Sequence, residues 1–297
     1  MNQEISFLDP KVLASISNLE LRARTAVEGF LTGLHKSPHR GFSVEFTDYR
    51  HYNLGDDIRH IDWKVFARSG KYYIKQYEDE TNVRCHIMLD CSASMGYGSE
   101  GITKLEYGRT LASALAYFMT GQRDAVGLIT FDDKIGEYLP SRYRQGHMMQ
   151  ILRTLANVKL GERTSLARPI SDLAFSLHRK GMVILISDLL DDEETVVKGL
   201  QHLRFKGNDV IVFHIMDNAE LTFPFDRISE FEDVESHETL AVAPQAIRES
   251  YLDQLEYFCS FYRRKCQASG IDYCLRNTSK PLDIALSSYL SKRAKSF

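Results

Sequence analysis

From residue 83 onward, short apolar runs alternate with longer amphipathic stretches, and this alternation limits the fold more than any other feature of the chain. The apolar runs lie at 83–89, 125–131, 182–187, 209–215 and 271–275. Strands that alternate with helices of ten or more residues predict a mostly parallel sheet with helices on both faces. A run at 135–139 follows the tight turn Asp132-Asp133-Lys134, which predicts one antiparallel edge strand. The sequence therefore predicts a doubly wound α/β fold.

The region before this alternation has a different character. Asp9-Pro10 predicts the start of a helix of about 20 residues, because proline is favoured at the first helical position. Residues 41–80 contain nine aromatic side chains and many charged ones. We expect residues 1–80 to form an N-terminal helical and aromatic appendage and residues 81–297 to form the α/β domain. A hairpin insertion is expected near 217–243.

Composition excludes several classes of protein. A formal net charge of −3 provides no basic field for nucleic acid. The five cysteines form no CxxC pair, which favours a reducing cytoplasm over a disulfide framework. The N-terminus lacks the pattern of a signal peptide, and no apolar run approaches the ~18 residues of a membrane span. We expect a cytoplasmic protein without a membrane span, which is compatible with peripheral association with a membrane.

The segment 86–96, with the sequence HIMLDCSASMG, contains the clearest candidate for a binding site. An apolar run ends at Asp90, and Ser92 and Ser94 follow at alternate positions. The crevice at the carboxyl end of a parallel strand is where α/β sheets bind ligands, and these three side chains are hard oxygen donors suited to Mg²⁺ or Mn²⁺. The alternative is a polar loop in which Asp90 caps the next helix.

Two later loops carry further oxygen donors. Thr164 and Ser165 precede a predicted helix, and Asp188 ends the run at 182–187 with Asp191 and Asp192 just beyond it. If the strands are parallel, the loops after 83–89 and 182–187 lie at the same edge of the sheet. Together the loops could provide oxygen ligands for an octahedrally coordinated divalent cation. One coordination position would remain open for an acidic group.

Two resemblances extend this interpretation. The Asp-x-Ser-x-Ser pattern, with a later threonine and aspartate on an α/β alternation, resembles the metal-ion-dependent adhesion site of von Willebrand factor A domains. The upstream segment resembles the bacterial family named domain of unknown function fifty-eight. The residues that carry this second resemblance are Glu45-Phe46, Tyr49-Arg50, Tyr52, Gly55-Asp56-Asp57-Ile58-Arg59, Ile61-Asp62-Trp63-Lys64 and Ala67-Arg68.

These resemblances imply both ligands and partners. The implied metal ligands are Asp90, Ser92, Ser94, Thr164 and Asp188, with Mg²⁺ as the ion and Mn²⁺ or Ca²⁺ as alternatives. Proteins of the family commonly occur with MoxR-type AAA+ ATPases, which implies such an ATPase as partner in protein assembly or activation. This chain departs from the Thr-Asp-Gly of many A domains because it has Ser187-Asp188-Leu189.

Three functions remain open on the sequence. The first is a non-enzymatic adaptor that uses the metal to engage an acidic side chain of a partner. The second is a metal-dependent hydrolase, against which the scattered histidines and the absence of Walker, GxSxG and HExxH motifs speak. The third is a docking module that acts through residues 41–80 with a vestigial metal site. Its binding residues would be Asp57, Arg59, Trp63 and Lys64. The sequence favours the first, so we expect no enzyme.

Overall fold

The chain divides into two compact units. One consists of Met1–Gly33 with Val83–Phe297, and the other of Leu34–Asn82. The computed structural model describes residues 9–36, 49–51, 63–75, 83–161, 165–177, 180–227, 229–232, 239–282 and 286–287.

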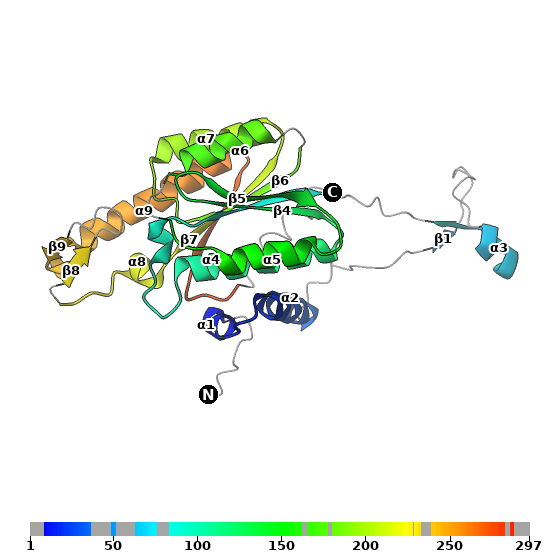
Figure 1. Cartoon of the computed structure of the whole chain (residues 1–297), viewed down its shortest axis with the longest axis horizontal. Helices are drawn as coiled ribbons and strands as arrows, with labels where there is room; N and C mark the ends of the chain where they lie inside the picture. Colours follow the sequence, from blue (N-terminus) through cyan, green and yellow to red (C-terminus); the bar gives the residue numbers. More distant parts are fainter. Residues whose placement is uncertain are drawn as a thin grey trace. The chain divides into compact units, whose positions relative to one another are not determined.

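A six-stranded sheet forms the centre of the larger unit (Figure 1). Its strands, in spatial order, are β10 (Asp272–Asn277), β7 (Asp209–Met216), β6 (Met182–Ser187), β3 (Arg84–Asp90), β4 (Ala125–Phe131) and β5 (Ile135–Arg142). All neighbours in this order are parallel except β4 and β5, which are antiparallel. The predicted doubly wound α/β fold, with a mostly parallel sheet and one antiparallel edge strand, is confirmed.

Helices cover both faces of the sheet, as the continuous apolar strands require. These helices are α4 (Lys104–Gly121), α5 (His147–Asn157), α6 (Ala167–Ser176), α7 (Glu193–Phe205) and α9 (Pro244–Ala268). Figure 1 shows α6, α7 and α9 on one face and α4 and α5 on the other. Every residue of β6 is buried, and the core on the α6 side includes Leu185, Leu200 and Tyr262.

The N-terminal region differs from the single helix predicted from Asp9-Pro10. Two helices, α1 (Pro10–Ala14) and α2 (Leu19–Lys36), are separated by a short break. The break arises because the Asn18 side chain accepts hydrogen bonds from the backbone of the first turn of α2. The Asp9 carboxylate caps α1, as predicted.

These two helices belong with the larger unit, whereas the sequence analysis grouped them with the segment at 41–80. The physical reason is the buried side chain of Arg22. Its guanidinium donates hydrogen bonds to Glu106 and Thr110 of α4 and to the carbonyl oxygen of Ile16. The apolar face of α2, which includes Phe30, is buried as well.

The smaller unit contains three described elements. Strand β1 (Tyr49–His51) pairs antiparallel with β2 (Tyr73–Lys75), and α3 (Trp63–Ser69) lies between them in sequence. The ring of Phe66 stacks on that of Tyr72, with 4.4 Å between their centroids.

Further elements follow β7 in the region where the sequence analysis expects a hairpin insertion. They are the short helix α8 (Asn218–Thr222) and a hairpin of β8 (Ser229–Glu232) and β9 (Thr239–Val242). Within the described residues, no helix is both long enough and apolar enough to cross a membrane.

Candidate functional site

The candidate site lies where the strand order reverses. Strand β3 is central, with β4 on one side and β6 on the other, so the chain leaves β3 in one direction and later returns on its opposite side. Ligands of open α/β sheets bind in the crevice at such a point, at the carboxyl ends of the strands. The last residue of β3 is Asp90, and β6 ends at Ser187 immediately before Asp188.

The loop after β3 holds its polar side chains close together. The buried Asp90 carboxylate accepts a hydrogen bond through Oδ1 from the backbone N–H of Ser92, at 2.9 Å. A short 3₁₀ helix, η2 (Ala93–Gly96), follows. The hydroxyl oxygens of Ser92 and Ser94 are 3.0 Å apart. Ser92 is buried and Ser94 is half-buried, so the loop is accessible from the side of Ser94.

The loop after β6 is tied to the loop after β3 by a serine that sequence reasoning did not select. The Ser187 hydroxyl donates a hydrogen bond to Oδ2 of Asp90 at 2.6 Å and accepts one from the backbone N–H of Leu189 at 2.9 Å. Asp188 is fully buried beside this contact. Leu189, which replaces the glycine of many A domains, has a φ of 58° in the left-handed region.

A buried lysine completes the cluster, and sequence reasoning missed it. Lys104, the first residue of α4, is 1% exposed. Its ammonium group lies 2.8 Å from Oδ2 of Asp188 and 2.7 Å from Oε1 of Glu220 in α8. Burial lowers the pKa of Lys104, but the charges of Asp188 and Glu220 more than offset this, so the net pKa is raised. Lys104 therefore remains charged inside the site.

Glu220 is held in place by the start of α8. It forms a capping box with Asp217, in which the Glu220 carboxylate accepts the backbone N–H of Asp217 at 2.7 Å. The carboxylate of Asp217 accepts hydrogen bonds from Ser99 and from the hydroxyl of Thr278. The segment before α4 and the loops after β6, β7 and β10 are thus joined by polar contacts.

The cluster carries more negative than positive charge. Asp188 and Glu220 both contact the ammonium group of Lys104, and the charge of Asp188 also acts on the neighbouring carboxylate of Asp90. Burial, followed by the nearby charge of Asp188, raises the pKa of Asp90 to about 7. Burial also raises the pKa of Glu220. When all three carboxylates are ionised, the cluster has a net charge of −2, and this charge would attract a cation.

The structure brings four of the five predicted metal ligands to one edge of the sheet. These are Asp90, Ser92, Ser94 and Asp188. The fifth, Thr164, lies outside the described residues. Asp191 and Asp192 serve instead as helix caps: the Asp191 carboxylate accepts the backbone N–H of Leu166, and that of Asp192 accepts the N–H of Thr195.

The predicted partner-binding residues lie in the smaller unit. Trp63 is 59% exposed and begins α3. The backbone of Lys64 lies in α3, and Asp57 and Arg59 lie outside the described residues.

The donor set fits a hard divalent cation. Within the ranges given above, no three His, Cys, Asp or Glu side chains are placed to hold a metal ion, so hydroxyl oxygens would have to contribute. The 3.0 Å between the Ser92 and Ser94 oxygens equals the separation of adjacent ligands in an octahedron with bonds of about 2.1 Å. A divalent ion held by Asp90 and Asp188 would favour the ionised form of both carboxylates. Chemistry, spacing and charge therefore agree with Mg²⁺.

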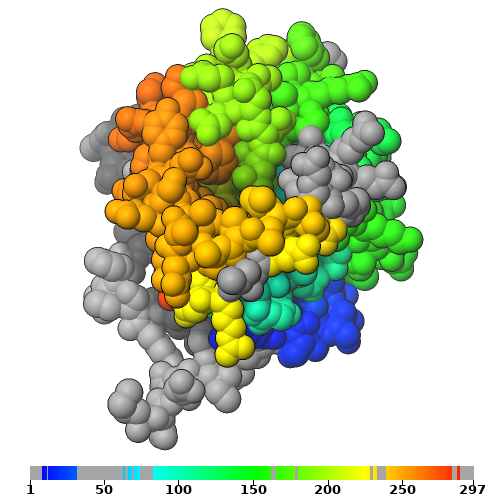
Figure 2. All heavy atoms as spheres, turned by 90° about the vertical axis from the view of Figure 1, so that its left-hand side faces the viewer, coloured from blue at the N-terminus to red at the C-terminus, as the bar shows by residue number. Residues whose placement is uncertain are grey.

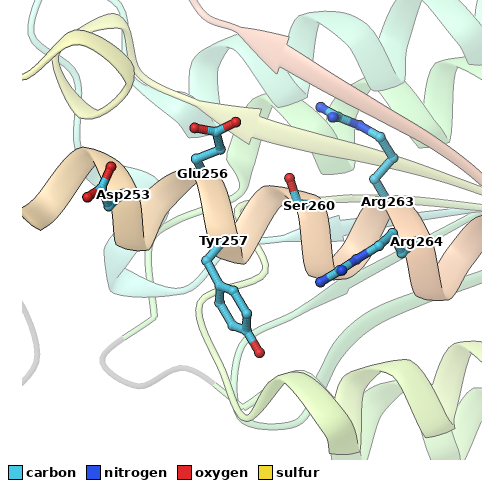
Figure 3. Close-up of a pocket in the computed structure, with 6 residues that line it drawn as sticks. All are labelled: Asp253, Glu256, Tyr257, Ser260, Arg263 and Arg264. Atoms are coloured by element: carbon cyan, nitrogen blue, oxygen red, sulfur yellow. The ribbon is translucent and has the colours of Figure 1, made fainter.

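Two depressions lie elsewhere on the larger unit. A cavity of about 480 Å³ is lined by Cys91, Asp132 and Arg153 among others. Figure 2 shows the face with α9 in orange and the hairpin region in yellow, next to a teal region of the chain. A second depression, of about 470 Å³, lies on α9. Figure 3 shows that Glu256 and Arg263 project from one side of that helix and Tyr257 from the other. None of these residues belongs to the cluster.

Comparison with known proteins agrees with this architecture. Residues 48–256 match the model of the family described as protein of unknown function DUF58. Uncharacterized proteins of Mycobacterium bovis and Mycobacterium tuberculosis are 27% identical over 233 residues, which cover 77% of this chain and 72% of each relative.

Among solved structures, BatB of Bacteroides thetaiotaomicron is similar with a TM-score of 0.50 and 20% identity, covering 72% of this chain and 99% of that one. An aerotolerance-related membrane protein of Bacteroides fragilis also has a TM-score of 0.50, with 18% identity over 71% of this chain and 99% of that one. At these identities the likeness concerns the fold alone.

Proposed function

This chain belongs to the DUF58 family of proteins of unknown function, and we propose that it is a non-enzymatic protein-binding module whose site is the cluster of Asp90, Ser92, Ser94 and Asp188. The observation that carries the proposal is the excess of buried negative charge beside two hydroxyl groups at the topological switch point. Unpaired buried charge is costly, so a cluster of this kind is favoured when a cation neutralises it.

The bound ion would be Mg²⁺, with Mn²⁺ or Ca²⁺ as alternatives. Asp90, Ser92, Ser94 and Asp188 would hold it, and Thr164 is proposed as a further ligand. When bound, the ion supplies a Lewis-acidic position that a carboxylate oxygen of a partner can occupy. Ser187 and the backbone of Ser92 hold the Asp90 carboxylate in place through both of its oxygens.

The partner proposed from the family resemblance is a MoxR-type AAA+ ATPase, and the proposed role is protein assembly or activation in the cytoplasm. None of the five cysteines, all of which lie within the described residues, forms a disulfide, which suits a reducing compartment. An acidic side chain of the partner would approach from the side of Ser94, the most accessible of the four described ligands.

The test is surface plasmon resonance between this chain and a purified MoxR-type ATPase from the same organism. We expect binding in Mg²⁺ that is lost in EDTA and lost in Asp90→Ala. Asp192→Ala is the matched control, because it removes an exposed carboxylate that only caps α7. Binding that persists both in EDTA and in Asp90→Ala would rule out the metal-bridged contact.

The same experiment separates this proposal from docking through the smaller unit. The exposed Trp63 is the observation that favours that second candidate, since aromatic side chains are enriched at interfaces. In that case Trp63→Ala or Arg59→Ala abolishes binding, whereas Asp90→Ala and EDTA leave it unchanged.

A further inference from the structure

The ammonium group of Lys104 contacts a carboxylate that is also a proposed ligand of the metal ion. It lies 2.8 Å from Oδ2 of Asp188, one of the proposed ligands, and both side chains are at most 1% exposed. Among the described residues, Oδ1 of Asp188 makes one long contact, to the backbone N–H of Leu190 at 3.4 Å. One oxygen of this carboxylate is therefore neutralised from within the chain, and the other is nearly free.

The position of Lys104 is fixed by its helix. Thr103 caps the start of α4 by accepting the backbone N–H of Glu106, and the backbone N–H of Lys104 donates to the carbonyl of Tyr97 at 2.9 Å. The side chain then has two acceptors inside the site, Asp188 and Glu220. A buried ammonium group needs such a pairing with a carboxylate. Here the pairing partly neutralises the Asp188 carboxylate, which is also a proposed metal ligand.

Glu220 gives the ammonium group a second place to rest. It is 2.7 Å from the lysine nitrogen, and its backbone position is set by the capping box of α8. An ammonium group that leaves Asp188 would therefore still be paired with Glu220.

We propose that Lys104 is a built-in competitor of the divalent cation: it neutralises Asp188 when the ion is absent and shifts to Glu220 when the ion binds. This inference rests on the proposed metal site. Like charges repel, and the repulsion between an ammonium group and a divalent ion on the same carboxylate lowers the affinity for the ion. Lys104 therefore makes the site weak and reversible. It also links occupancy of the site to α8.

The test is binding of Mn²⁺ alone to the full chain, measured from the electron paramagnetic resonance signal of the free ion, with Mg²⁺ as competitor. We expect Lys104→Met and Lys104→Gln to bind at least tenfold more tightly than the wild type. Glu220→Gln should bind at least threefold more weakly, because the ammonium group then remains on Asp188 and one negative charge is lost. Lys11→Met is the matched control: it breaks an exposed ion pair with Glu100 and should stay within twofold of the wild type.

The outcomes distinguish failure of the proposed competition from failure of the proposed metal site. Equal affinities in the wild type and the Lys104 variants would overturn the competition and leave the metal site standing. No binding in any folded variant would overturn the proposed metal site itself, and the competition with it. Circular dichroism establishes that each variant is folded. If both Lys104 variants fail to fold, Glu220→Gln decides, since an affinity at or above that of the wild type contradicts the competition.

Discussion

A buried histidine in the central strand makes stability depend on pH. His86 lies in β3 between Gly127 of β4 and Val183 of β6, and it is 6% exposed. Its Nδ1 has no hydrogen-bond partner among the described residues. Burial, followed by the charge of Arg84, lowers the pKa of His86 from 6.5 to about 4. We therefore expect the folded protein to resist protonation at this position.

The sign and size follow from proton linkage. Between pH 6.5 and pH 4 the unfolded chain takes up a proton at His86 and the folded chain does not, so stability decreases as the pH falls. With these two pKa values, the histidine costs roughly 2–3 kcal/mol of unfolding free energy at pH 4.5 and well under ~1 kcal/mol at pH 7. His86 alone thus accounts for a loss of roughly 2 kcal/mol between the two pH values.

The assay is urea denaturation of the wild type and His86→Gln at pH 7.0 and pH 4.5. Glutamine does not titrate, so the stability difference between the two proteins should shift by roughly 2 kcal/mol in favour of the variant at the lower pH. Met88→Leu, a buried change in the same strand, is the control and should give the same difference at both values. An equal difference for His86→Gln at the two pH values would refute the argument.

Two further predictions concern packing. A Cβ at Gly127 would lie 2.7 Å from the carbonyl oxygen of Leu139, so Gly127→Ala should push β5 away from β4. We expect the free energy of unfolding, measured by urea denaturation, to fall by about 1–3 kcal/mol. Gly121→Ala, which meets no atom within 4 Å, should not lower it. Arg22→Met removes the buried guanidinium and should lower the free energy of unfolding by about 2–3 kcal/mol, measured by thermal denaturation. The guanidinium of Arg24 is exposed, so Arg24→Met should leave the melting temperature unchanged. A loss in the controls that equals the loss in the test variants would contradict both.

The sequence predicts the sheet because its strands are chemically simple. Runs such as 182–187 are uniformly apolar, and a strand that is buried on both faces needs no other signal. The N-terminal helices show where such reasoning ends. The apolar stripe of α2 predicts a buried face, but only the contact of Arg22 with Glu106 reveals that the face packs on α4. Periodicity identifies which side of a helix is buried and does not identify its neighbour.

The candidate site divides in the same way. Asp90, Ser92, Ser94 and Asp188 are predictable because oxygen donors follow apolar strands whose carboxyl ends share one edge. Lys104 is not, because a lysine at the start of a helix is normally solvated and only the tertiary structure brings it between Asp188 and Glu220. The serine of Ser187-Asp188 had a signal, since its hydroxyl follows the same strand, but nothing local indicates its bond to Asp90.

Leu189 indicates which part of the site can move. A φ of 58° costs a non-glycine residue about 1–2 kcal/mol. Its side chain is fully buried in the core beneath α7 and α9, which returns about 1.5–3 kcal/mol, and its carbonyl accepts the hydroxyl of Tyr262 at 3.2 Å. The turn that carries Asp188 is therefore fixed by the core, where a glycine would have left it loose. With Asp90 held through both oxygens as well, the side chain of Lys104 is the component best able to respond to a bound cation.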